Sequence, residues 1–218
     1  MNEALATFLV ALSAIFFVVD PLSAVPIFLA MTRADSVEKR RETALRASIT
    51  AALVLSGFAL GGAWIFRLLG IGLPAFKVAG GVVLLLLALD MLRTQPSKAR
   101  ITQGEVEEGA GKDDIAIVPL AMPLLAGPGS IATAIVLMAR ARGGAWWQVA
   151  AVLVAIAVTC AAAGLILAGA ARTEKVLGKT TLAILERAAG LLLVAIAIQF
   201  MMDGLGEGLP GLAGTLRL

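Results

Sequence analysis

Six apolar stretches, each long enough to cross the hydrocarbon core of a bilayer, dominate this sequence. A helix rises about 1.5 Å per residue and needs about 20 apolar residues to span roughly 30 Å of hydrocarbon. The stretches cover residues 4–30, 44–66, 71–92, 115–138, 147–170 and 183–203. They predict an all-α membrane protein with six transmembrane helices.

The composition supports this class and excludes others. Of the 218 residues, 60% are hydrophobic and only 15% are charged, whereas about 25% of a soluble domain is charged. The chain has no His and a single Cys, Cys160, which excludes an intrachain disulfide and a zinc or haem site built on His. The net charge of +3 is too small to indicate nucleic-acid binding. We expect the first stretch to be a retained span, because no basic residue precedes it.

Basic residues predict the orientation of the spans. Thirteen of the 18 Lys and Arg residues lie on the side of the membrane where spans one, three and five end. The other five lie on the side where spans two, four and six end. Cytoplasmic loops carry the excess of Lys and Arg. Six spans with this distribution place both termini on the outer, periplasmic side of the inner membrane.

An internal repeat divides the sequence into two halves. Pro21 and Pro26 match Pro123 and Pro128 at a constant offset of 102 residues. Because each half holds three spans, the halves would lie in opposite orientations. We predict a first three-span repeat at residues 1–92, a polar cytoplasmic linker at 93–114 that serves as a simple tether, a second, inverted three-span repeat at 115–204 and a short outer tail at 205–218.

The paired prolines predict broken helices in spans one and four. Proline lacks an N–H donor and disrupts the helix, and the freed backbone groups cannot face lipid. Single prolines are usually structural kinks, but matched breaks in two inverted halves indicate a transport site near the membrane midplane. Helices restarting near Pro26 and Pro128 would offer free N–H groups to a carboxylate. The residues expected at this site are Pro21, Ser23, Ala24, Pro26, Pro123, Ala126, Gly127, Pro128, Gly129 and Ser130.

Polar side chains inside the spans add candidates. Asp20 lies deep in span one, where a charged side chain costs about 2.5–3.5 kcal/mol even on the mildest scale. It is a candidate to bind a proton or the ammonium group of a substrate, and equally to cap the helix that restarts at Pro21. Gln199 is a candidate to face the bundle, and Thr133 is a candidate because it lies one turn past Ser130, although such residues more often serve helix packing.

Three stretches resemble the signature sequences of the MarC/SnatA family, six-span inner-membrane proteins placed among the LysE-type transporters. They are residues 20–28 (DPLSAVPIF), 76–85 (FKVAGGVVLL) and 115–130 (IAIVPLAMPLLAGPGS). The resemblance implies transport of small neutral amino acids such as glycine and alanine, driven by a proton or sodium gradient and without another cofactor.

Two other function classes are alternatives. An enzyme needs a positioned acid, base, nucleophile or metal, and the spans hold no clustered carboxylates, so we expect no enzymatic activity. A channel or an exporter for another small solute is the second alternative. The expected partners are a small-molecule substrate and the lipid bilayer. Gly57 and Gly61, at GxxxG spacing, add a homo-oligomer to these expectations.

Overall fold

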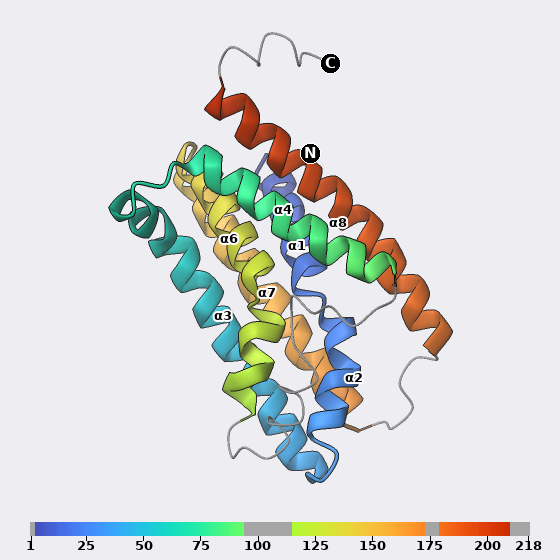
Figure 1. The fold of residues 1–218 in the computed structure, drawn as a ribbon. Helices are drawn as coiled ribbons and strands as arrows, with labels where there is room; N and C mark the ends of the chain where they lie inside the picture. Colours follow the sequence, from blue (N-terminus) through green and yellow to red (C-terminus); the bar gives the residue numbers. More distant parts are fainter. Residues whose placement is uncertain (1–2, 94–114, 173–178, 210–218) are drawn as a thin grey trace.

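The computed structural model describes residues 3–93, 115–172 and 179–209, and within these ranges the regular elements are helices (Figure 1). This confirms the all-α prediction. The predicted linker beyond Arg93 and the tail beyond Leu209 lie outside the described residues. The elements are α1 (Glu3–Val19), α2 (Pro21–Met31), α3 (Val37–Leu68), α4 (Leu73–Leu92), the irregular helical segment η1 (Ala116–Leu125), α6 (Pro128–Arg142), α7 (Trp146–Ala170) and α8 (Lys179–Gly208).

The helices match the six predicted spans. Five of them are long and apolar enough to cross a membrane, with α1 and α2 together forming the first, and the pair η1 and α6, bent by 62°, makes the sixth. Spans one and four are therefore the broken ones, as predicted. Helix α8 continues to Gly208, past the expected end of span six at residue 203.

Helix α3 shows how the sequence sets the packing. Its small residues recur every three or four positions, which places them on one face of the helix, and this face is fully buried at Ala44, Ala47 and Ala51. Large apolar residues such as Leu53, which is 69% exposed, lie on the opposite face. Small residues let neighbouring helices approach closely in a membrane, so the alanine face packs inward and the leucine face is left for lipid.

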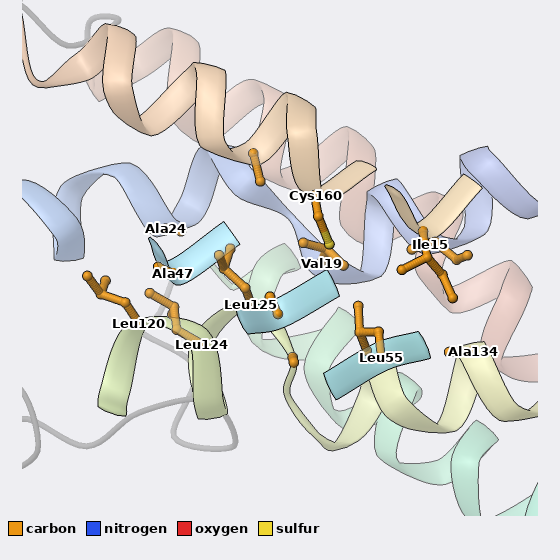
Figure 2. Packing of buried hydrophobic residues seen from close by; sticks show 14 of the residues in the cluster. Ile15, Val19, Ala24, Ala47, Leu55, Leu120, Leu124, Leu125, Ala134 and Cys160 are labelled. Carbon is orange, nitrogen blue, oxygen red and sulfur yellow. The ribbon is translucent and has the colours of Figure 1, made fainter. Parts of the chain in front are cut away.

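The packing joins the two halves of the chain. The larger buried cluster combines α1, α2, α3, η1, α6 and α7, and Figure 2 shows Val19, Leu125 and Cys160 within it. The smaller cluster lies mainly between α4 and α8, which run side by side (Figure 1). Apart from α6 against α7, each extensively packed pair of described helices joins one from residues 3–92 to one from residues 116–208. The inverted relation of the halves stays a prediction.

Candidate functional site

Asp20 forms the break in span one. It stands between α1 and α2 with φ 48° and ψ 67°, in the left-handed region, where Asp is one of the few residues besides Gly found with any frequency. Its carboxylate accepts a hydrogen bond from the Ser23 N–H at 3.4 Å, and Pro21 at the first helical position has no N–H to leave unpaired. Asp20 therefore caps α2, while only 6% of it is exposed.

The expectation that a half-helix begins near Pro26 is wrong. Helix α2 begins five residues earlier, at Pro21, and Pro26 lies inside it with its ring exposed. The capping carboxylate explains the difference, because it accepts the Ser23 N–H, one of the free N–H groups of a helix that starts directly after Asp20.

The break in span four has a different construction. Val118 and Met122 in η1 adopt extended backbone angles, as expected of residues before proline. The chain then passes through Ala126 and Gly127 before α6 begins at Pro128, as predicted. A Cβ added at Gly127 would lie only 2.7 Å from the carbonyl oxygen of Pro123, so the turn needs glycine there for a close approach of the backbone.

A small cavity lies at the second break and reaches α1 shortly before the first. Its volume is about 20 Å³, enough for roughly one water molecule. It is lined by Val18, Val83, Leu87, Leu124, Gly127, Pro128, Gly129 and Ser130. Pro128, Gly129 and Ser130 are the first residues of α6, so the cavity adjoins the N-terminus of this helix. This end is polar, because the first N–H groups of a helix have no hydrogen-bond partner inside the helix. Span one contributes to the cavity through Val18, two residues before Asp20.

Gly129 brings the N-terminus of α6 into contact with two other helices. A Cβ at this position would lie 3.1 Å from Leu84 of α4 and 3.5 Å from Val18 of α1. Ser130 follows it with 3% exposure. The site is therefore assembled by α1, α4, η1 and α6 rather than by the two broken spans alone.

A carboxylate that sequence reasoning missed joins the first break. The Ser23 hydroxyl donates a hydrogen bond to Glu186 of α8 at 3.2 Å. Glu186 is half-buried and lies inside the predicted sixth span, so its charge within an apolar stretch was a signal that could have identified it. Ser23 thus links the Asp20 cap to α8.

The remaining candidates are spread over the bundle. Ala24 and Ala126 are buried in the larger cluster. The Thr133 hydroxyl donates a hydrogen bond to the Gly129 carbonyl of its own helix at 2.9 Å. Thr133 therefore serves the structure of α6. The expectation that Gln199 faces the bundle is wrong, because its side chain is exposed and its amide donates to Asp203 at 2.8 Å.

Two ion pairs hold α8 in place. The Lys77 ammonium group, on a side chain only 3% exposed, contacts both carboxylate oxygens of Glu207 at 2.5 and 2.6 Å. Arg140 of α6 pairs with Asp203 of α8. These pairs connect α8 to α4 and to α6, and Ser23 connects it to α2, so α8 is tied by polar contacts to three elements.

Comparison with known proteins identifies the family. The sequence model of the MarC family of integral membrane proteins matches residues 5–209. The chain belongs to the MarC family. Its relatives include a UPF0056 membrane protein of Methanocaldococcus jannaschii, 40% identical over 91% of this chain and 95% of the relative, and YhcE of Escherichia coli, 31% identical over 91% of each. No solved structure matches the chain. The chain is an integral, multi-pass membrane protein.

Proposed function

We propose that this MarC-family protein is a secondary transporter of small neutral amino acids, glycine- or alanine-like, coupled to a proton or sodium gradient. The observation that carries the proposal is a cavity in the second break, at the N-terminus of α6, which is also lined by Val18 of α1, two residues before the first break. The substrate carboxylate binds the free N–H groups of Gly129 and Ser130. The hydroxyl of Ser130, which lines the cavity, donates a further hydrogen bond to it. The substrate class comes from the resemblance of residues 20–28, 76–85 and 115–130 to the family signatures.

The cavity is too small for an amino acid in the described conformation, so transport needs a movement that enlarges it. Val83 and Leu87 of α4 form one wall of the cavity, and α4 packs chiefly on α8. In the proposal, the α4–α8 pair moves against the other helices and opens the cavity to each side in turn. Helices α4 and α8 supply most of the smaller buried cluster, to which α1 and α6 add one buried residue each, and this supports a movement of the two as a pair.

Uptake into proteoliposomes tests the proposal. We would measure radiolabelled glycine and alanine with imposed proton or sodium gradients, in wild type, Ser130→Ala and Ser13→Ala. Ser13 is the matched control, because its exposed hydroxyl bonds only the Leu9 carbonyl of its own helix. We expect gradient-dependent uptake that Ser130→Ala reduces and Ser13→Ala leaves unchanged. Absence of uptake by folded, correctly inserted protein would refute the proposal.

The placement in the membrane is part of the same proposal. We place the protein in the inner, plasma membrane with both termini on the outer side, supported by the Lys and Arg distribution and by bacterial and archaeal relatives. Gly57 and Gly61 have open space around them, which supports a contact with a second copy along α3.

A further inference from the structure

Helices α3 and α4 diverge from their shared loop (Figure 1). A hollow lies between them. Both pack extensively against α6, whereas their backbones come close to each other at few positions. The hollow has a volume of about 380 Å³, far larger than the cavity at the second break. We call it the α3–α4 groove, and α6 forms its floor through Ile131, Ala132 and Ile135.

Glycines on α3 and α4 bring these helices close to the floor of the groove, and aromatic rings line its walls. A Cβ at Gly80 would lie 3.1 Å from Ala132, and one at Gly62 would lie 2.7 Å from Ile135, so these positions bring α4 and α3 close to α6. The Phe66 and Phe76 rings, 4.1 Å apart between centroids, line the groove near the α3–α4 loop. The twelve lining residues carry no charged or hydroxyl side chain.

We propose that the α3–α4 groove binds the acyl chain of a membrane lipid. The groove lies between helices that cross the membrane, so hydrocarbon chains are the medium that surrounds it. Its apolar lining has no charged or hydroxyl side chain that could bind a polar solute.

The size of the groove favours a single chain over a helix of a second copy. One turn of an α-helix about 10–12 Å across and 5.4 Å long occupies roughly 400–600 Å³. The groove, at about 380 Å³, cannot enclose a helix, so a second copy would fill it only with side chains of one helix face, whereas an acyl chain is thin enough to lie inside it along its length.

The groove also touches the cavity at the second break. Val83 and Pro128 line both hollows. A bound acyl chain therefore lies against the first residue of α6 and between α4 and the helices α3 and α6. It braces the N-terminus of α6 from the lipid side.

Lipid retention tests this proposal without reference to transport. Ala79 lines the groove from an exposed position on α4, so Ala79→Phe fills the groove without disturbing the α4–α6 contact. Ala157→Phe is the matched control, at an exposed position of α7 that does not line the groove. We expect native mass spectrometry of detergent-purified protein to show one retained phospholipid on wild type and on Ala157→Phe. The lipid-bound fraction should fall several-fold in Ala79→Phe and less in Ala79→Leu.

Photolabelling locates the lipid. In vesicles of phosphatidylethanolamine and phosphatidylglycerol with a mid-chain diazirine, we expect labels to concentrate at Ile131 and Ile135 over Leu165, which is 75% exposed on α7. The proposal would be overturned if the labelling of each residue followed only its exposed fraction. It would also be overturned if folded Ala79→Phe retained as much lipid as wild type. A wild-type dimer that Ala79→Phe dissociates and that carries no lipid would overturn it as well. None of these results bears on uptake of glycine or alanine.

Discussion

The Ser23 hydroxyl of α2 donates a hydrogen bond to the Glu186 carboxylate of α8 at 3.2 Å, across 163 positions of the chain. It lies three residues after the capping residue Asp20, whose carboxylate accepts the Ser23 N–H. Ser23 therefore contacts a carboxylate on each side, one through its backbone and one through its side chain. The geometry of the first break and the position of α8 are coupled through this single residue.

A double-mutant cycle measures this coupling. Ser23→Ala and Glu186→Ala each remove one partner, and the coupling energy in unfolding should be about 0.5–1.5 kcal/mol. The cycle is needed because Glu186 makes a further interaction, so the single substitution reports more than one contact. Thermal unfolding in detergent gives the four stabilities. Strictly additive losses would contradict the coupling.

The capping role of Asp20 predicts different effects for two substitutions. Asp20→Ala removes the carboxylate that caps α2. It also leaves an alanine at positive φ, where its side chain cannot accept a local hydrogen bond. The substitution should therefore destabilise the protein by about 0.5–2 kcal/mol. Asp20→Asn keeps an oxygen acceptor and tolerates the left-handed region, so its stability should stay close to wild type. Unfolding measurements decide whether the cap matters. Loss of uptake by a stable Asp20→Asn would assign the carboxylate a transport role in addition.

The Lys77–Glu207 pair should respond asymmetrically to the loss of either partner. Glu207→Gln leaves the Lys77 ammonium group, 3% exposed, without its counter-charge, and such a loss costs about 3–5 kcal/mol. Lys77→Met leaves the Glu207 carboxylate, which is 50% exposed and can be hydrated. We therefore expect Glu207→Gln to lower the unfolding temperature more than Lys77→Met. The opposite order would show that Lys77 reaches water by another route.

Two glycine substitutions should have opposite signs. Gly127→Ala places a Cβ 2.7 Å from the Pro123 carbonyl oxygen, and such overpacking costs about 1–3 kcal/mol. In monomeric protein, Gly61→Ala meets no atom within 4 Å in the middle of α3 and should stabilise the helix by about 0.5–1 kcal/mol. Thermal unfolding compares the two directly. A tolerated Gly127→Ala would show that the second break can relax.

The packing between halves predicts that the chain can be divided. Cutting within residues 93–114, for example by expressing residues 1–103 and 104–218 separately, removes no contact between described helices. Co-expressed halves should copurify as a folded complex through an affinity tag on one of them, and each half alone should be degraded or aggregated. A first half that is folded by itself would contradict the prediction.

The sequence predicted the spans and the two breaks but not how each break is built. Length and hydropathy placed the six spans because lipid demands about 20 apolar residues in each. The proline pairs did not reveal which proline restarts the helix, since that depends on the residue before it. Asp20 can cap a helix at Pro21, whereas the matching residue Met122 cannot, and the second helix restarts at Pro128.

Tertiary contacts account for the other differences. Glu186 was predictable as a charge within a span, but its partner Ser23 lies in the other half and no local pattern joins them. The orientation of Gln199 depends on where α8 lies against α4, and this leaves the amide exposed beside Asp203. The cavity residues Val18 and Leu87 are ordinary apolar positions whose role follows from the approach of α6 at Gly129.

The packing across halves has a consequence for biogenesis. The helices of residues 3–92 are synthesised first, yet the helices that bury their inner faces belong to residues 116–208. Insertion of the first three spans therefore precedes their folding, and they stay as separate helices in the bilayer until the ribosome has made the second half. Their alanine-rich faces are open to chaperones, insertases and quality-control proteases throughout that interval, which makes the speed of synthesis through residues 94–208 a determinant of yield.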